Sequence, residues 1–293
     1  MASDDSVMNQ PMQNLSHAGR KEHVLRMLEI HDSVQVSELA ELFAVSEVTI
    51  RNDLAALARE GLVMRVRGGA QPLLRGQSEL DFDHRLRLQA EEKQAIARAA
   101  ATFVAEGDSV ALDSSTTAYY LALELRVKRE LVVVTNGLRI AAALADAPGV
   151  TVVVTGGVVR APAMSLVGEV GANLLRTTQI SMGFVGARGL SIERGLMDLN
   201  PDEARTKQHL VAACDRVIGI FDRTKWKRSA LLSFVDAARV HAIVTDTGAP
   251  AEDVHLWRAR GVEVVTVEPP ARGAALIRPR DLSRMHLARR VPT

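Results

Sequence analysis

A run of five residues, Asp113-Ser114-Ser115-Thr116-Thr117, follows an apolar stretch and precedes a helical pattern that begins at Ala118. Serine and threonine hydroxyls, together with the free N–H groups at the start of a helix, bind anions such as phosphate. Ordinary helix capping uses the same residue types, so the run alone leaves both interpretations open. The chemistry that it could perform is the binding of an anion.

Further polar residues follow other apolar runs. They are Thr135-Asn136-Gly137, Thr155-Gly156-Gly157, Asp222-Arg223-Thr224-Lys225, and a helical segment with Glu203 and Lys207. Loops at the carboxyl ends of parallel strands are where ligands bind. The glycines would let the backbone approach a ligand, and Asp222–Lys225 supplies cations for a phosphate. A plain salt bridge between Glu203 and Lys207, four residues apart, is the simpler alternative for that pair.

These loops require strands and helices to hold them. The expected strands are Ser109–Leu112, Leu131–Thr135, Val150–Val154, Met182–Val185, Val217–Phe221, His241–Thr245 and Val262–Val267. The expected helices between them are Glu92–Val104, Ala118–Leu125, Leu138–Ala145, Asp202–Cys214 and Ala251–Arg260. Continuous Val/Ile-rich strands that alternate with helices predict a doubly wound, mostly parallel α/β sheet.

Three helical patterns precede this sheet: Arg20–His31, Ser37–Phe43, and one that follows the N-cap residue Ser46 and ends near Glu60. Helical spacing turns Ile50, Leu54 and Leu57 of the third helix inward. The outward face and its flanks then carry small and hydrogen-bonding side chains: Val48, Thr49, Arg51, Asn52, Ala55 and Arg59. Such a surface suits the base edges in a DNA major groove.

The stretch after the third helix alternates apolar residues with arginine and reaches a Gly68-Gly69 turn, which predicts a β-wing. Arg65 and Arg67 would lie beside phosphates or in the minor groove. The predicted DNA-binding residues are Ser46, Val48, Thr49, Arg51, Asn52, Arg59, Arg65 and Arg67. A helix-turn-helix that contacts only protein is the alternative.

Composition limits the class of protein. A chain of 293 residues with 47% hydrophobic and 24% charged residues has room for about two folded domains and is not wholly disordered. The net charge is +1, and residues 1–75 carry eight Lys/Arg against ten Asp/Glu, a net of −2. DNA binding needs local positive charge, which residues 61–75 supply with three arginines and no acid. The single cysteine, Cys214, excludes an internal disulfide and is expected to pack inside its helix.

The expected organisation is a disordered polar tail (1–18), a winged helix-turn-helix domain (19–75), a linker (76–91), an α/β domain (92–268) and a basic tail (269–293). The start has no signal-peptide pattern, and no apolar run approaches a membrane span, so we expect a cytoplasmic protein without a membrane partner. The basic tail has six arginines and one aspartate. Disorder is the simpler interpretation of this tail, and a nonspecific nucleic-acid contact is the alternative.

Several catalytic patterns are missing from the sequence. Thr155-Gly156-Gly157 does not make a dinucleotide fingerprint, and there is no phosphate-binding Gly-x-x-x-x-Gly-Lys loop. No Ser/His/Asp order and no histidine cluster with metal-ligand spacing stands out. We therefore expect no catalytic residue, no metal site and no cofactor.

The segment Arg20–Pro72 closely resembles the DNA-binding module of DeoR-type bacterial transcription regulators. Three runs carry the resemblance: Val36-Ser37-Glu38-Leu39-Ala40, Val45-Ser46-Glu47-Val48-Thr49-Ile50-Arg51-Asn52-Asp53-Leu54 and Arg67-Gly68-Gly69-Ala70. Arginine is frequent in that family at the position of Asn52. This departure bears on the operator sequence that is read, not on whether DNA is bound.

The likeness extends from about Asp81 to Asp246 and resembles the DeoR sensor module. Its motifs are Phe82-x-x-Arg85, Glu92-Lys93, Asp113–Thr117, Val134-Thr135-Asn136, Gly156-Gly157, Leu166-Val167-Gly168, Gly186-Ala187-x-Gly189 and Asp222-x-x-Lys225. The resemblance implies a fold similar to ribose-5-phosphate isomerase and a phosphorylated sugar as ligand. It implies that Asp113, Ser114, Ser115, Thr116 and Thr117 hold the phosphate or sugar, and that Asn136, Gly157, Glu203, Lys207 and Lys225 complete the pocket.

The isomerases typically have Gly-Ala-Asp-Glu where this chain has Gly186-Ala187-Arg188-Gly189. Proton abstraction from a sugar phosphate needs carboxylates, so this departure favours binding without turnover. We therefore expect a transcriptional regulator, more specifically a repressor, that binds double-stranded operator DNA as a dimer or tetramer and responds to a phosphorylated sugar. The alternatives are a sugar-phosphate isomerase with an accessory DNA-binding head and a scaffold that does not bind DNA.

Overall fold

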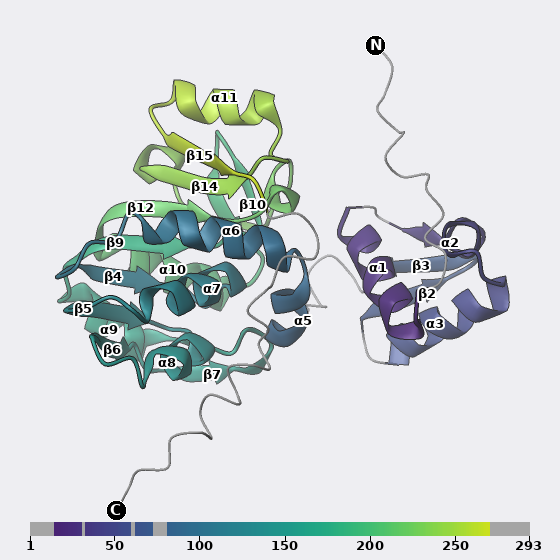
Figure 1. Ribbon diagram of the computed structural model, residues 1–293, viewed down its shortest axis with the longest axis horizontal. Coiled ribbons are helices and arrows are strands. Elements are labelled where there is room, and N and C mark those ends of the chain that lie inside the picture. Colours follow the sequence, from purple (N-terminus) through teal and green to yellow (C-terminus); the bar gives the residue numbers. More distant parts are fainter. Residues whose placement is uncertain (1–14, 31–32, 60–61, 73–80, 270–293) are drawn as a thin grey trace, which may run out of the picture.

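The computed structural model describes residues 15–30, 33–59, 62–72 and 81–269, which form two parts (Figure 1). The smaller part, here called the head, consists of α1 (His17–Ile30), β1 (Val34–Gln35), α2 (Val36–Phe43), α3 (Glu47–Arg59), β2 (Val63–Val66) and β3 (Gly69–Pro72). Its three strands form one antiparallel sheet in the order β1-β3-β2. The predicted winged helix-turn-helix is confirmed.

The head folds around the inward face of α3. Ile50, Leu54 and Leu57 are buried in one cluster with side chains from α1 and α2, as the helical spacing predicts. The sequence did not predict that Asp53 is also buried, where it accepts from Arg20 Nε at 2.7 Å. This ion pair fixes α1 against α3.

The larger part comprises the remaining elements. They are α5 (Phe82–Arg87), α6 (Ala90–Ala101), β4 (Ser109–Leu112), α7 (Thr116–Leu125), β5 (Leu131–Thr135), α8 (Leu138–Leu144), β6 (Val150–Val154), β7 (Val158–Arg160), β8 (Ser165–Val167), α9 (Glu169–Arg176), β9 (Ile180–Val185), β10 (Gly189–Ser191), β11 (Gly195–Asp198), α10 (Pro201–Ala212), β12 (Cys214–Ile220), β13 (Leu232–Val235), β14 (Ala242–Asp246), α11 (Ala251–Ala259) and β15 (Glu263–Val267).

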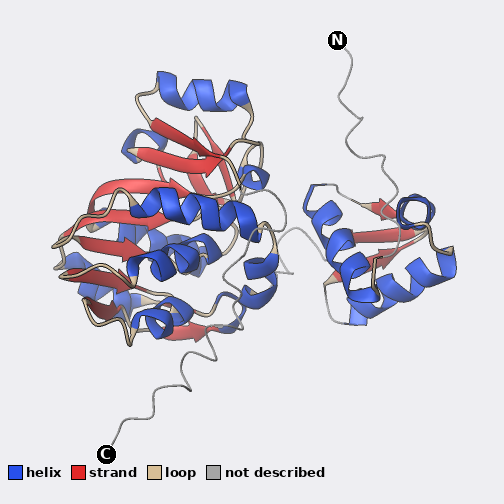
Figure 2. Ribbon diagram, viewed as in Figure 1, coloured by secondary structure: helices blue, strands red, loops and turns tan. Residues whose placement is uncertain are grey.

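Seven strands form the central sheet in the order β15-β14-β12-β9-β4-β5-β6, and all of its neighbouring strands are parallel. Helices cover both faces of this sheet (Figure 2). Successive strand residues point to opposite faces, so Ile243 joins one buried cluster while Ala242 and Val244 join the other. The predicted doubly wound α/β fold is confirmed.

The chain order reverses between two adjacent strands, β4 and β9. From β4 the chain proceeds outward through β5 to β6, and from β9 it proceeds through β12 and β14 to β15 on the other side. Such a switch point leaves a crevice at the carboxyl ends of the two strands, because their crossover connections leave in opposite directions. The fold thus fixes where a ligand has room.

Some details differ from the sequence expectation. Cys214 is the first residue of β12 rather than the end of a helix, and its buried Sγ lies 3.1 Å from the Leu210 carbonyl oxygen. The two-stranded sheet β7-β8 and the three-stranded sheet β10-β11-β13 were not predicted, because strands of three or four residues are too short to show a clear alternation of apolar and polar residues. Within the described residues, none of the helices combines the length and apolarity needed to span a membrane.

Candidate functional site

The outward face of α3 is open to solvent. Val48, Arg51, Asn52 and Arg59 are exposed, and Thr49 is half-buried. Ser46 precedes the helix and caps it, since its Oγ accepts from the Thr49 N–H at 3.1 Å. The face that the sequence assigned to DNA is therefore presented by the fold and rigidly held at its N-terminus.

The wing lies next to this helix in the fold. Arg65 and Arg67 are exposed, one on β2 and one in the turn to β3. Gly68 has a φ of 82°, which favours glycine, and Gly69 packs so closely that a Cβ there would lie 2.0 Å from the Val34 carbonyl oxygen. Both glycines are thus required for the hairpin to pair with β1.

The arginines on α3 have weak local partners. Arg51 donates to Glu47 at 2.6 Å across one helical turn, with both side chains about half exposed (52% and 48%). Arg59 donates from Nε to the Ala55 carbonyl oxygen at 3.4 Å. Exposed pairs of this kind contribute little to stability, so these guanidinium groups can exchange partners at small cost.

A cavity lies at the switch point of the sheet. Its walls come from the segments after three adjacent strands: 114–117 after β4, 186–188 after β9 and 221–225 after β12. Arg85 of α5, Lys93 of α6, and Leu88 and Gln89 between these helices also line it. The sequence predicted the strand-end loops but not this part of the lining.

The cavity encloses about 710 Å³ outside the protein atoms, part of it open to solvent. The lining has five Lys or Arg (Arg85, Lys93, Arg188, Lys207, Lys225) and three acids (Asp198, Glu203, Asp222), a net charge of +2.

Lys207 is the centre of a buried ion network. Its Nζ donates to Asp198 at 2.9 Å and to the Gly186 carbonyl oxygen at 2.9 Å, and it lies 3.0 Å from Asp113 Oδ2. Asp113 also accepts from the N–H groups of Ser115 and Gly186. Because the three protons of the ammonium already have acceptors, Lys207 fastens the loops after β4 and β9 to α10 rather than offering a donor to a ligand.

The pKa values in this network follow from the same geometry. Burial alone would lower the pKa of Lys207, but Asp198 and Asp113 outweigh that effect and raise it. Burial alone would raise the pKa of Asp198, but the Lys207 ammonium and the Arg188 guanidinium lower it to about 2. Lys207 and Asp198 are therefore both charged across the neutral range.

Gly186 lies where two of the cavity loops touch. A Cβ at this position would be 2.5 Å from Ser115 Cβ and 2.8 Å from Ser115 Oγ. The loop after β9 can approach the hydroxyl-rich loop only because residue 186 has no side chain. The same residue donates its N–H to Asp113 and accepts from Lys207, so both loops are fixed at one point.

The salt bridge between Glu203 and Lys207, the simpler alternative for that pair, is not formed, because Lys207 pairs with Asp113 and Asp198. Glu203 instead accepts from the Ser165 hydroxyl, from Ser114 Oγ at 3.3 Å and from Arg160 at 3.4 Å. Asn200 caps the start of α10 by accepting from the Glu203 N–H at 3.1 Å, which places the carboxylate at the cavity wall. Glu203 is thus a buried, fully partnered acceptor.

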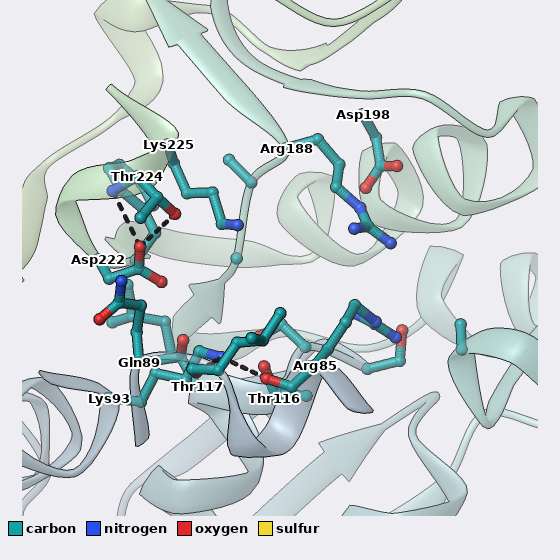
Figure 3. Close-up of a pocket in the computed structure, with 18 of the residues that line it drawn as sticks. Arg85, Gln89, Lys93, Thr116, Thr117, Arg188, Asp198, Asp222, Thr224 and Lys225 are labelled. Atoms are coloured by element: carbon teal, nitrogen blue, oxygen red, sulfur yellow. Dashed lines mark hydrogen bonds between the residues drawn. The ribbon is translucent and has the colours of Figure 1, made fainter. Parts of the chain in front are cut away.

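The opposite wall carries Lys225 and Asp222. Burial alone would raise the pKa of Asp222, but Lys225 and Lys93 outweigh it and lower the pKa. Figure 3 shows Lys225 and Arg188 reaching from one side toward the space above Arg85, Thr116 and Thr117. Arg223, which the sequence also offered as a cation, points elsewhere and pairs with Glu92 at 2.9 Å and Asp246 at 3.2 Å.

Seven of the ten predicted effector residues line the cavity: Ser114, Ser115, Thr116, Thr117, Glu203, Lys207 and Lys225. The other three do not line it. Asp113 is fully buried in the ion network, Asn136 donates to the Leu166 carbonyl oxygen, and a Cβ at Gly157 would meet the Val167 carbonyl oxygen at 2.3 Å. Gly157 therefore serves the pairing of β7 with β8.

Seven further residues line the cavity that were not among the ten predicted effector residues: Arg85, Gln89, Lys93, Arg188, Asp198, Asp222 and Thr224. Five of these positions, all except Gln89 and Asp198, lay within the quoted motifs Phe82-x-x-Arg85, Glu92-Lys93, Gly186-Ala187-x-Gly189 and Asp222-x-x-Lys225, so the motifs were the available signal. Among the described residues, no group of three or more His, Cys, Asp or Glu side chains could hold a metal ion.

Two family models match the chain in the same two places. Residues 20–73 match the DeoR-like helix-turn-helix domain, and residues 88–247 match the DeoR C terminal sensor domain. The architecture is that of a DNA-binding head joined to a sensor. The chain belongs to the DeoR family of helix-turn-helix transcriptional regulators.

Curated relatives cover most of the chain. The HTH-type transcriptional regulator GolR of Listeria innocua serovar 6a is 35% identical over 78% of this chain and 89% of its own. The glycerol-3-phosphate regulon repressor of Escherichia coli K12 is 29% identical over 79% of this chain and 91% of its own. The HTH-type transcriptional regulator GlpR of Haloferax volcanii is 30% identical over 85% and 97%.

Solved structures with a similar arrangement include ribose 5-phosphate isomerase A from Neisseria gonorrhoeae (TM-score 0.35, 15% identity, 48% of this chain). The chain spans about half the length (54%) of that isomerase. The Pyrococcus horikoshii OT3 translation initiation factor eIF-2B is also similar (TM-score 0.39, 12% identity), with 78% of this chain and 82% of that chain covered.

Proposed function

We propose that this regulator is a repressor of carbohydrate-metabolism genes whose operator binding is controlled by a phosphorylated sugar. The observation that carries the proposal is the cavity at the switch point. It combines hydroxyls and N–H groups at the start of α7 with cations from the facing loops, and its lining has a net positive charge. An anionic group on a polar molecule is the ligand that fits this chemistry.

In the head, we propose that α3 enters the major groove of DNA and that the wing lies along the sugar-phosphate backbone of the DNA. Asn52, with a donor and an acceptor on one exposed amide, is suited to a bidentate contact with adenine. Arg51, Arg59, Arg65 and Arg67 would contact phosphates or the minor groove. Ser46, Val48 and Thr49 line the leading end of the helix, where space for a base edge is needed.

In the sensor, we propose that the phosphate binds at the hydroxyl-rich loop of residues 114–117 and is faced by Lys225 and Arg188. Lys207, Glu203 and Asp113 hold the loops in place, and Asn136 and Gly157 support them from behind. The name of one relative refers to the regulon of glycerol 3-phosphate, a phosphorylated polyol. This is the class of molecule that the charges of the cavity favour.

Helix α5 offers a route from the cavity to the head. Arg85, Leu88 and Gln89 line the ligand cavity, while His84, Arg87 and Leu88 line a second cleft. The far wall of that cleft is formed by residues of the head: Ala18, Lys21, Leu25, Leu57 and Leu62. A ligand that moves the residues around Leu88 would change the contact with the head, and its differential affinity would shift the equilibrium between DNA-binding arrangements.

The DNA arm of the proposal is tested by binding to the DNA upstream of the protein's own gene, measured against salt concentration. Arg51→Ala combined with Arg65→Ala should weaken binding and reduce the magnitude of the salt slope by about two, close to 0.9 for each lost phosphate contact. Arg129→Ala with Arg260→Ala, two exposed arginines of the sensor, is the matched control and should leave the slope unchanged. An unchanged slope in the head variant would reject DNA contact by these residues.

The effector arm is tested by thermal unfolding in the presence of pentose, hexose and triose phosphates, each compared with the unphosphorylated sugar and with inorganic phosphate. A ligand at about 100 times its Kd stabilises the folded state by about 2.7 kcal/mol, which is readily seen as a rise in Tm. The rise should require the phosphate and should disappear in Lys225→Met. A rise of equal size with the unphosphorylated sugars would refute the proposal.

A further inference from the structure

One edge of the central sheet is covered poorly. Strand β6 pairs only with β5, and among the described residues no other strand adjoins it. Its five residues, Val-Thr-Val-Val-Val, are half-buried or exposed, whereas most of β9 in the middle of the sheet is buried. Proteins usually protect an apolar edge strand, because its free N–H and C=O groups invite another chain.

Exposed apolar side chains gather beside this edge. We call Val154, Val158, Val159, Val170 and Leu174 the edge patch, and Val158 and Val170 are 71% and 64% exposed. The residues are close in space: a Cβ at Gly156 would lie 3.2 Å from Val170, and β7 pairs with the strand β8 that leads into α9. Figure 1 shows β6, β7 and α9 at the same side of the sensor. Clustered exposed hydrophobic residues mark interaction surfaces.

Helix α9 presents a face with charges at both ends. Gly171, Ala172 and Leu175 are buried, while Val170 and Leu174, one turn apart, face outward. Glu169 lies in the first turn and Arg176 in the last, on the same flank of the exposed face by helical spacing. The two charges are seven positions apart in the sequence, about 10 Å along the helix axis.

We propose that the edge patch is the interface between two copies of this chain, in which the two α9 helices pack antiparallel about a two-fold axis. That arrangement brings each Glu169 beside Arg176 of the other copy and each Val170 beside the other Leu174. The pattern is self-complementary, as a two-fold interface requires. A second copy of this chain brings both charges that these contacts need, with no further requirement on the partner.

Within one chain the charges of α9 have only exposed partners. Glu169 lies 3.6 Å from Arg176 and 2.8 Å from Arg205, and all three side chains are more than half exposed. Such pairs contribute little and can be exchanged for contacts across an interface. Two copies would also supply the two heads that a palindromic operator needs, although the interface does not depend on that function.

The first experiment measures molar mass by light scattering and by sedimentation over a range of concentrations. Val170→Asp and Leu174→Asp should each raise the dissociation constant about tenfold or more, since each places a carboxylate in the middle of the interface. Val127→Asp and Leu231→Asp, two exposed apolar residues outside the patch, are the controls and should leave it unchanged. A monomeric wild-type protein, or patch variants that dissociate no more than the controls, would overturn the proposal.

The second experiment uses charge reversal. Glu169→Arg and Arg176→Glu should each weaken self-association, because each variant places like charges opposite one another. An equimolar mixture of the two variants should associate again, since every new contact then joins an acid to a base. A purely intrachain role of these residues, or a loss of folding, would leave the mixture no better than either variant alone, and that result would also overturn the proposal.

Discussion

Two sets of ion pairs in this molecule have similar distances between their charged atoms, but one is exposed to solvent and the other is buried. In the head, Arg51 and Glu47 meet at 2.6 Å on the exposed surface of α3. In the sensor, Lys207 meets Asp198 at 2.9 Å and Asp113 at 3.0 Å, and all three side chains are almost fully buried. The exposed pair is easily opened, whereas the buried group can lose a member only by leaving a charge without a partner.

The difference shows which cations are available to an anionic partner. An arginine that binds DNA must exchange its acidic partner within the protein for a DNA phosphate. An exposed i, i+4 ion pair permits that exchange at little energetic cost. Lys207 lines the cavity, but its ammonium group donates to acceptors of the protein itself. In the proposed function, Lys225 therefore contacts the effector, and Lys207 supports the site.

The largest effect expected from this comparison is on Lys207. Lys207→Met should lower the free energy of unfolding by about 3–5 kcal/mol, because two buried carboxylates lose their counter-charge. Lys225→Met should cost less than Lys207→Met, because the buried Asp222 beside it keeps Lys93 and two hydrogen bonds from Thr224, yet it should abolish the response to ligand. Urea unfolding measures both.

Asp198→Asn in the Lys207→Met background provides the control. Removing one of the unpaired carboxylates should recover part of the lost stability, and the two changes should be clearly non-additive. Additive losses, or equal losses for Lys207→Met and Lys225→Met, would contradict the division of roles.

The next effect is on acid stability. The pKa of Asp198 is about 2 in the folded protein, below its value near 4 in the unfolded chain. A depressed pKa contributes stability that is present above pH 4 and is lost as the pH falls toward 2. This carboxylate should therefore contribute roughly 2 kcal/mol of the stability at neutral pH.

Urea unfolding at pH 6, 4 and 3 checks this prediction. The difference in unfolding free energy between wild type and Asp198→Asn should shrink as the pH falls. A difference that stays constant with pH would show that Asp198 is not held ionised by Lys207 and Arg188.

Most of the sheet could be predicted because each central strand is a short Val/Ile-rich run that needs burial on both faces. The strands Ser109–Leu112, Leu131–Thr135 and Val150–Val154 have the predicted bounds. The antiparallel pieces depend on contacts between distant segments, such as β11 with β13, and local periodicity does not encode them. Cys214 was misplaced because it directly follows the apolar residues Val211–Ala213 of the predicted helix, whereas the charged Asp215 and Arg216 separate it from the apolar run that indicates the strand.

The third prediction separates helix capping from contact with DNA. Ser46→Ala should lower the stability of the protein by about 1 kcal/mol through loss of the N-cap of α3. Ser46→Asp should keep the cap and the stability but weaken DNA binding, because it sets a negative charge at the end of the helix that faces phosphates. Thermal unfolding and DNA titration on the same samples distinguish the two roles, and equal DNA affinity for wild type and Ser46→Asp would remove Ser46 from the interface.

The smallest effect concerns the exposed pair itself. Glu47→Ala should change stability by only about 0.3–0.5 kcal/mol, the range for an i, i+4 surface pair. It should also strengthen DNA binding slightly, since Arg51 no longer has an acid beside it. DNA titration at low and moderate salt measures this, and weaker binding would show that Glu47 positions Arg51 for its contact.

The site was less predictable than the sheet. Strand-end hydroxyls and Lys225 could be placed from sequence, because the topology brings the ends of parallel strands together. The sequence could not show that Lys207 would find Asp198 and Asp113 instead of Glu203, since these acids lie on other elements. It could not show either that Arg85 and Gln89 line the cavity, because no periodic pattern links α5 to the sheet edge.

Gly186 shows how the absence of a side chain can set the distance between two loops. Even a methyl group there would push the two anion-facing loops apart and loosen their common anchor. The distance between these two loops is therefore set by the backbone of residue 186 against the side chain of Ser115, and a change at this single position would alter the width of the cavity that both residues line.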